Sequence, residues 1–256
     1  MRFFENKAKV NAVLNATYYM NKSMKLIYSL ILLATFISFN SPDKNNSDYL
    51  NDVKTELQKT WPKNRTINLV FHGHSVPAGF FKTPVVNTLQ AYPFLVLKEL
   101  KTLYPYAVIN VINTSIGGEN SVGGEKRFES EVLIHRADVL FIDYALNDRS
   151  VGPAKASEAW SKMIEKALEK KIKVILLTPS PDQNVKLSDD KSDLEKHRLQ
   201  IIALSQKYGV GLVDSYEKFK QKFNAGEPVS EYMSQVNHPN EKGHALIANQ
   251  IVEYFK

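Results

Sequence analysis

Four short segments of the sequence carry residue types that could together perform nucleophilic catalysis. They are FHGHSVPAG (71–79) with Ser75, NTSIGGEN (113–120) with Gly118, YALND (144–148) with Asn147, and VNHPN (236–240) with His238. A serine activated by a histidine base can attack a carbonyl carbon, and a backbone N–H beside a glycine, together with an asparagine amide, can stabilise the oxyanion that forms. Taken singly, each segment is ordinary, because serine, glycine and Asn-Asp pairs are common at helix N-caps and in turns.

Elements that could position these residues follow from the hydrophobic pattern. Five short apolar runs predict strands: INLVF (67–71), AVINVI (107–112), VLFIDY (139–144), KVILLT (173–178) and GLVD (211–214). Segments with helical spacing lie between and around them at 49–61, 87–103, 154–171, 194–208 and 240–255. Strands rich in Val and Ile that alternate with helices indicate a parallel sheet covered on both faces. We therefore expect an α/β fold, a three-layer α/β/α sandwich with a five-stranded parallel sheet.

The candidate residues occupy the positions where such a sheet builds its sites. Ligands bind at the carboxyl ends of the strands in open α/β sheets. Ser75, Gly118 and Asn147 come shortly after the first, second and third runs, and His238 comes just before the last helix. We expect the four side chains or backbone groups to meet at one edge of the sheet.

In combination and in this order, the four segments resemble the SGNH (GDSL-like) hydrolase family, over residues 67–256. GHSVPAG is similar to the family's GDSL block, with His74 where the family usually has Asp, and NTSIGG, YALND and HPN are similar to its later blocks. The resemblance implies the flavodoxin-like SGNH fold and an esterase without cofactor or metal. It implies these roles: Ser75 as nucleophile, His238 as base, and Gly118 and Asn147 as oxyanion-hole donors.

The sequence departs from the family pattern beside the base. The family usually has Asp three residues before the histidine, but Gln235 stands there. Replacing the orienting Asp by an amide in a serine protease lowers turnover about 10⁴-fold. Either the Gln235 side-chain oxygen or a nearby backbone carbonyl accepts the imidazole N–H, or an acid such as Asp148 or Asp182 substitutes for the missing Asp. We favour a neutral acceptor over a substitute acid, because Gln235 stands at the matching position.

Composition and charge limit the possible partners. The 256 residues carry a net charge of +6, but residues 1–40 hold five Lys/Arg and one acid, which leaves 28 basic and 26 acidic residues in the rest. No basic stripe with interleaved aromatics is visible, so nucleic acid is not expected as a partner. The chain contains no cysteine, which rules out disulfides.

The N-terminal segment has the pattern of a signal peptide. Leu26–Phe39 is an uncharged run of 14 residues preceded by Lys22 and Lys25 and followed by a polar stretch. It is short for a membrane span, which needs about 20 residues. We expect an N-terminal extension and signal peptide at 1–40, with translation starting at Met24 as one option. A linker and lead-in helix (41–62) and the hydrolase domain (63–256) would follow, with export to the periplasm or outside the cell and no stable membrane span.

The expected substrate is a small-molecule or polysaccharide ester, and the preferred function is an exported carbohydrate O-acetylesterase. That preference comes from the family resemblance alone. A lysophospholipase or short-chain lipid esterase is the alternative among enzymes, because the loop Phe80–Val86 could offer an apolar surface. A carbohydrate-binding relative without activity is the alternative from another class, and a flavodoxin-like cofactor binder is disfavoured because no phosphate-binding loop is present.

Overall fold

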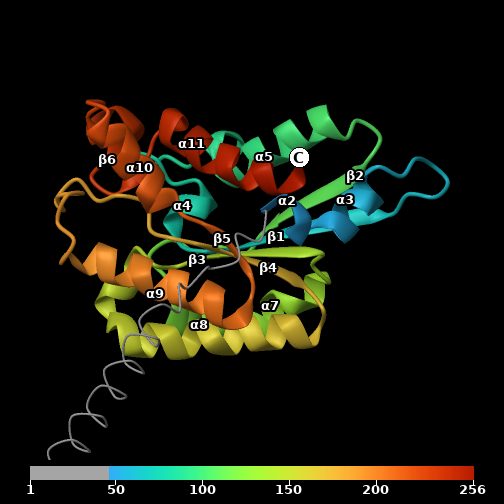
Figure 1. Ribbon diagram of the computed structural model, residues 1–256, viewed down its shortest axis with the longest axis horizontal. Helices are drawn as coiled ribbons and strands as arrows, with labels where there is room; N and C mark the ends of the chain where they lie inside the picture. Colours follow the sequence, from blue (N-terminus) through green and yellow to red (C-terminus); the bar gives the residue numbers. More distant parts are fainter. Residues whose placement is uncertain (1–45) are drawn as a thin grey trace, which may run out of the picture. The chain divides into compact units, whose positions relative to one another are not determined.

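The computed structural model describes residues 46–256, and it contains the predicted five-stranded parallel sheet (Figure 1). The strands are β1 (Thr66–Gly73), β2 (Val108–Asn113), β3 (Val139–Asp143), β4 (Lys173–Leu177) and β5 (Gly211–Val213). Their order in the sheet is β2-β1-β3-β4-β5, and every neighbouring pair is parallel. The predicted fold class, a three-layer α/β/α sandwich, is confirmed.

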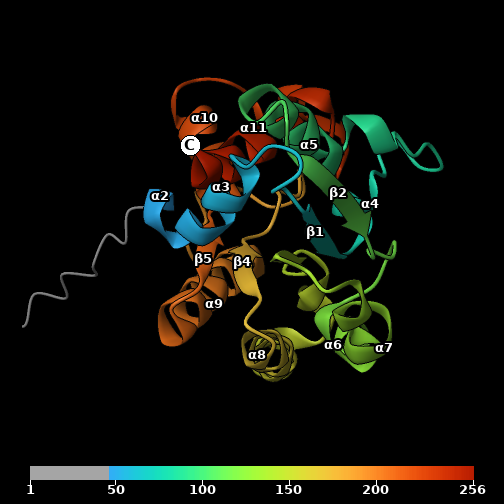
Figure 2. The same ribbon diagram turned by 90° about the vertical axis from the view of Figure 1, so that its right-hand side faces the viewer.

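Helices cover both faces of the sheet, as Figures 1 and 2 show. One layer contains α2 (Asn46–Tyr49), α3 (Asn51–Leu57), α5 (Tyr92–Leu103), α10 (Ser215–Asn224) and α11 (Glu241–Val252). The other contains α6 (Ser121–Lys126), α7 (Phe128–Glu131), α8 (Gly152–Glu169) and α9 (Asp193–Tyr208). The short helix α4 (Ser75–Ala78) follows β1 directly. The described residues also form five 3₁₀ helices: η1 (Thr88–Gln90), η2 (Leu133–His135), η3 (Asn147–Ser150), η4 (Val229–Tyr232) and η5 (Glu253–Phe255).

The apolar strand residues separate into two cores because successive side chains of a strand point to opposite faces. In β1, Leu69 and Phe71 belong to the core under α5 and α11, whereas Val70 belongs to the core over α8. All three are completely buried. This two-sided burial explains why the strands appear in the sequence as nearly continuous apolar runs.

Local signals fix several helix ends. Ser192 and Asn240 cap the N-termini of α9 and α11 by accepting backbone N–H groups with their side chains. Gly209 ends α9 in the left-handed conformation, with φ +63°, which glycine adopts without a steric penalty. The N-cap of the last helix, Asn240, thus lies two residues after His238, and the helix itself begins at Glu241.

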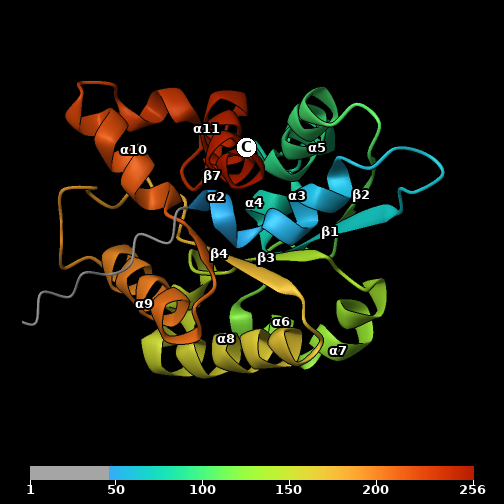
Figure 3. The same cartoon turned by 45° about the vertical axis from the view of Figure 1, so that its right-hand side comes forward.

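The structure differs from the sequence prediction at several elements, including the short helices α6 and α7, which were not predicted. The expected helix 49–61 is shorter, because α3 ends at Leu57 and Trp61 lies in a turn with 84% of its surface exposed. Helix α10 was not predicted. A two-stranded antiparallel sheet of β6 (Met233–Gln235) and β7 (His238–Pro239) was not predicted either, and Figure 3 shows β7 beside α11.

The N-terminal predictions lie outside the described residues. They comprise the extension and signal peptide at 1–40 and the first residues of the linker. Within 46–256, no helix is long and apolar enough to cross a bilayer.

Candidate active site

The structure brings Ser75 and His238 together from opposite ends of the domain sequence. Ser75 is the first residue of α4, directly beyond β1, and its Oγ lies 2.9 Å from Nε2 of His238. Both residues are largely buried, each with 7% of its surface exposed. This geometry allows the imidazole to accept the hydroxyl proton, which is the arrangement that activates a serine nucleophile.

The second ring nitrogen of His238 meets a backbone carbonyl. Its Nδ1 lies 2.9 Å from the carbonyl oxygen of Phe81 and 2.7 Å from Nε2 of Gln235. The β6–β7 pairing places Gln235 directly opposite His238. The amide oxygen of Gln235 accepts the backbone N–H of Thr83 at 3.0 Å, which turns the amide NH₂ group toward the imidazole.

These contacts favour two different tautomers of His238. An imidazole protonated at Nδ1 donates to the Phe81 carbonyl and leaves Nε2 free to accept the Ser75 proton. An imidazole protonated at Nε2 accepts the Gln235 N–H at Nδ1 and cannot act as a base toward Ser75. The carbonyl of Phe81 therefore supports the competent tautomer, whereas the amide of Gln235 opposes it.

Burial lowers the pKa of His238 below its ordinary value, and this effect outweighs the hydrogen bond to the Phe81 carbonyl, which raises it. The imidazole is therefore neutral at neutral pH. A neutral ring is the form that a general base requires.

The acids considered as replacements for the missing Asp have other partners. The side chain of Asp148 accepts the Ser121 backbone N–H at 2.8 Å and the Trp160 indole N–H at 2.7 Å. Asp182 pairs with Arg149 at 2.8 Å. The contacts of His238 described above include neither carboxylate.

Gly118 and Asn147 lie at the same edge of the sheet, in the segments that follow β2 and β3. Gly118 has φ +81°, and a Cβ atom built on it would meet nothing within 4 Å, so its backbone is open to a ligand. The side-chain amide of Asn147 donates to the backbone oxygen of Glu119 at 2.9 Å. An amide nitrogen carries two hydrogens, so one remains available for a substrate oxygen.

His74 replaces the family's usual Asp and keeps a capping function. Its Nδ1 accepts the backbone N–H of Val76 at 3.2 Å, and its Nε2 lies 3.3 Å from Oδ1 of Asp143. The other oxygen of Asp143 accepts the Tyr92 hydroxyl proton at 3.0 Å. His74 thus belongs to a buried polar network behind the nucleophile.

His244 is packed into the core. Its Nδ1 accepts the Tyr92 backbone N–H at 3.2 Å, and its ring stacks on Phe81 with 4.9 Å between the centroids. Burial lowers the pKa of His244 to about 3, so the ring is neutral. Within residues 46–256, no cluster of His, Asp or Glu side chains could hold a metal ion.

Phe80 forms a wall between the base and the glycine loop. Its ring centroid lies 6.2 Å from that of His238, and a Cβ on Gly117 would come within 3.1 Å of the Phe80 ring. Exposed aliphatic side chains follow it in the same loop, with Val85 and Val86 about half exposed. The loop that follows the helix of Ser75 in the sequence therefore exposes apolar side chains.

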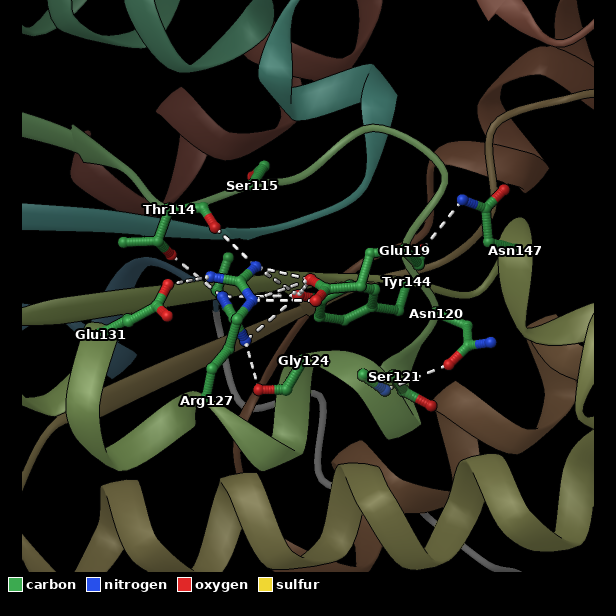
Figure 4. Close-up of polar contacts among 12 residues, drawn as sticks. Thr114, Ser115, Glu119, Asn120, Ser121, Gly124, Arg127, Glu131, Tyr144 and Asn147 are labelled. Carbon is green, nitrogen blue, oxygen red and sulfur yellow. Dashed lines mark hydrogen bonds and ion pairs between the residues drawn. The ribbon is translucent and has the colours of Figure 1, made fainter.

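Sequence reasoning missed a group of residues beneath the Gly118 loop, shown in Figure 4. Arg127 pairs with Glu119, the Tyr144 hydroxyl donates to Glu119 at 2.7 Å, and His72 contacts Tyr144 at 3.2 Å. Burial and the nearby Arg127 charge lower the pKa of His72 to about 4. The pairing of Arg127 with Glu119 has no helical spacing, so no pattern in the sequence revealed it.

The sheet order and the Ser75–His238 contact fit the class of α/β serine hydrolases. Residues 71–246 match the GDSL-like lipase/acylhydrolase family, and the chain belongs to this family. This membership supports a carboxylic ester hydrolase. No curated protein matches the sequence.

Solved structures show the same fold at low identity. A two-domain esterase active on acetylated mannans is 22% identical with a TM-score of 0.67, and the match covers 81% of this chain and 52% of that one. The chain thus spans about half the length of that esterase. A GDSL-like lipase from Parabacteroides merdae (17% identity, TM-score 0.64) matches over 74% of this chain and 95% of its own. A catalytic mutant of an acetylxylan esterase from Geobacillus stearothermophilus (17% identity, TM-score 0.65) matches over 74% and 94%.

Proposed function

We propose that the protein is an exported carbohydrate O-acetylesterase that acts through an acyl-enzyme on Ser75. The observation that carries this proposal is the 2.9 Å contact between Ser75 Oγ and His238 Nε2, with the Phe81 carbonyl on the other ring nitrogen. The acetylated mannan and acetylxylan esterases among the structural neighbours support an acetylated carbohydrate as substrate.

In the proposed reaction, His238 takes the proton of Ser75 while Oγ attacks the ester carbonyl carbon. The backbone N–H groups of Ser75 and Gly118 and the amide of Asn147 stabilise the tetrahedral oxyanion, and each such donor typically lowers the barrier by about 3–4 kcal/mol. His238 then gives the proton to the sugar oxygen as its bond to the carbonyl carbon breaks, and the sugar leaves as an alcohol. Water, activated by the same imidazole, releases acetate and restores Ser75.

A lipid ester remains the second candidate because of one observation. Val85, Val86 and Leu89 follow the nucleophile loop and are 50%, 45% and 75% exposed. Exposed aliphatic side chains suit an acyl tail better than a sugar. The acyl preference of the enzyme separates the two candidates.

The test compares turnover of p-nitrophenyl acetate and p-nitrophenyl octanoate, together with acetate release from acetylated xylo- and manno-oligosaccharides. Ser75→Ala is the control, and all Ser75-dependent turnover should disappear in it. Preference for acetate and release of acetate from the oligosaccharides would support the carbohydrate esterase. Preference for octanoate would support the lipid esterase, and a lack of Ser75-dependent turnover with every ester would favour a carbohydrate-binding relative.

The proposed export is tested separately. Expression of the full chain with a C-terminal tag, followed by N-terminal sequencing of the protein outside the cytoplasm, should find cleavage near residue 40. Retention of the uncleaved chain in the cytoplasm would contradict it.

A further inference from the structure

The loop that carries Gly118 is tied at both ends to one side chain, Arg127. This loop, residues 114–120, connects β2 with α6. Nη2 of Arg127 donates to the backbone oxygen of Thr114 at 2.7 Å and to Oε2 of Glu119 at 2.5 Å, while Nε donates to Oε1 of Glu119 at 2.9 Å (Figure 4). A planar guanidinium can make such fixed parallel contacts, whereas an ammonium group cannot. Arg127 therefore fixes the distance between residues on either side of Gly118.

Glu119 extends this connection to the second proposed oxyanion donor. Its carboxylate also accepts the Tyr144 hydroxyl proton at 2.7 Å, and its backbone oxygen accepts one amide hydrogen of Asn147 at 2.9 Å. With one hydrogen of the planar amide fixed in this way, the direction of the other is fixed as well. The position of Glu119 thus sets the direction in which Asn147 can donate to a substrate.

Helix α6 has the small residues that this cluster needs. A Cβ on Gly123 would lie 3.0 Å from Cγ of Glu119, and a Cβ on Gly124 would lie 2.3 Å from the Tyr144 hydroxyl. Glycine is unfavourable in a helix compared with alanine. The adjacent glycines are explained by the space that the Glu119 and Tyr144 side chains occupy.

The ion pair itself is shielded from water. The side chains of Arg127 and Glu119 are only 12% and 14% exposed. Although burial alone would raise the pKa of Glu119, the hydrogen bonds from Arg127 and Tyr144 hold it below its ordinary value, so the carboxylate is charged. We call the contacts of Arg127 with Thr114 and Glu119 the clamp, and it thus consists of a full charge pair with several hydrogen bonds.

We propose that Arg127 is a positioning residue for the oxyanion donors, because it holds Gly118 and, through Glu119, Asn147 in the orientation that the reaction needs. This inference rests on the proposed esterase function. It assigns a role in the reaction to a residue outside the four segments that resemble the family.

A purely structural role for Arg127 makes different predictions. If the ion pair only stabilises the fold, its loss lowers the melting temperature and leaves kcat of the folded enzyme unchanged. If it positions the donors, kcat falls while KM changes little, because the donors act on the oxyanion and not on the bound ester.

The test is Arg127→Lys, which keeps the charge but cannot bridge Thr114 and Glu119 at once. Its matched control is Arg198→Lys, because Arg198 is 15% exposed and makes similar hydrogen bonds to Asp214 and Glu195, away from the Gly118 loop. With p-nitrophenyl acetate, we expect Arg127→Lys to lower kcat about 10- to 100-fold, less than the effect of deleting a donor outright, with KM changed less than about twofold. Arg198→Lys should leave both constants near the wild-type values. An unchanged kcat in Arg127→Lys would overturn the proposal.

A double-mutant cycle with Asn147→Ala tests whether Arg127 affects kcat through the Asn147 amide. Since Arg127 acts in part through the Asn147 amide, the fall in kcat caused by Arg127→Lys should be several-fold smaller in the Asn147→Ala background. Independent, multiplicative effects of the two substitutions would contradict the connection through Glu119.

Hydrogen exchange separates failure of this inference from failure of the proposed function. Amides of residues 115–119 should exchange faster in Arg127→Lys than in Arg198→Lys, whether or not a substrate is known. A wild-type protein that turns over no ester would contradict the esterase proposal alone. Unchanged exchange in this loop would contradict the clamp alone.

Discussion

Gln235→Glu tests the catalytic base by changing a single group next to it. The substitution replaces the amide NH₂, 2.7 Å from His238 Nδ1, by a carboxylate oxygen, while the other oxygen can still accept the Thr83 N–H. The new carboxylate accepts the Nδ1 proton and so favours the tautomer that leaves Nε2 free for Ser75. It also stabilises the imidazolium that forms during attack.

The magnitude follows from the distance and the burial. Two unit charges about 4 Å apart attract each other by about 4 kcal/mol at an effective dielectric constant of about 20. Gln235 is only partly buried, so solvent screening and the cost of desolvating a new carboxylate reduce the net gain to about 1.4–2.7 kcal/mol. This corresponds to a roughly 10- to 100-fold increase in kcat.

The pH profile gives an independent measure. The wild-type pKa of His238 is lowered by burial, so the acid limb of kcat/KM should lie below the ordinary histidine value of about 6.5. An adjacent negative charge favours the protonated ring and raises its pKa, so Gln235→Glu should move this limb to higher pH. Turnover of p-nitrophenyl acetate from pH 4 to 9 measures both effects.

Gln183→Glu is the matched control, because Gln183 contacts the backbone oxygen of Gln235 at 3.2 Å. It places the same charge in the same region without touching the imidazole, and neither kcat nor the acid limb should change much. A decrease in kcat at every pH in Gln235→Glu would refute the reasoning and show that the amide, and not the Phe81 carbonyl, orients His238.

Three further substitutions have defined expectations. Asn147→Ala should lower kcat about 10²- to 10³-fold with little change in KM, as measured with p-nitrophenyl acetate, because it deletes a proposed oxyanion donor; a change confined to KM would contradict that role. Phe80→Ala should raise kcat/KM for p-nitrophenyl octanoate roughly tenfold relative to kcat/KM for p-nitrophenyl acetate, because it removes the wall between His238 and the glycine loop. An unchanged ratio of the two constants would place the acyl group elsewhere. Gly124→Ala should destabilise the fold by about 1–3 kcal/mol in urea unfolding, since its Cβ would collide with the Tyr144 hydroxyl, and an unchanged midpoint would show that helix α6 can shift freely.

The sheet could be predicted because its central strands are buried on both faces. β3 is buried at all five positions, and β1 is buried at all but Thr66 and Asn68, so both appear as nearly continuous apolar runs. Helix α10 gives a much weaker signal. Of its ten residues, only Ser215, Tyr216 and Phe219 are buried, and four charged residues separate its apolar positions.

The position of Ser75 at the carboxyl edge of the sheet was predictable from topology, whereas its meeting with His238, which does not directly follow a strand of the parallel sheet, was expected from the family resemblance. Their catalytic roles stay predictions. The acceptor on Nδ1 was not predictable by residue type, because it is the backbone oxygen of Phe81, and every residue has such an oxygen. The Arg127–Glu119 pair was missed for a related reason: its partners face each other across a loop whose path depends on the tertiary fold.

The two departures from the family pattern differ in their consequences. At position 74, the imidazole caps α4 through Nδ1, as a carboxylate would, and presents Nε2 to Asp143, where a second carboxylate would meet like charge. That replacement therefore keeps the capping bond. At position 235, the amide keeps the hydrogen bond to Thr83 but turns a donor toward a ring nitrogen that must itself carry a proton. Only the second departure acts on the base directly, so kcat should depend far more on residue 235 than on residue 74.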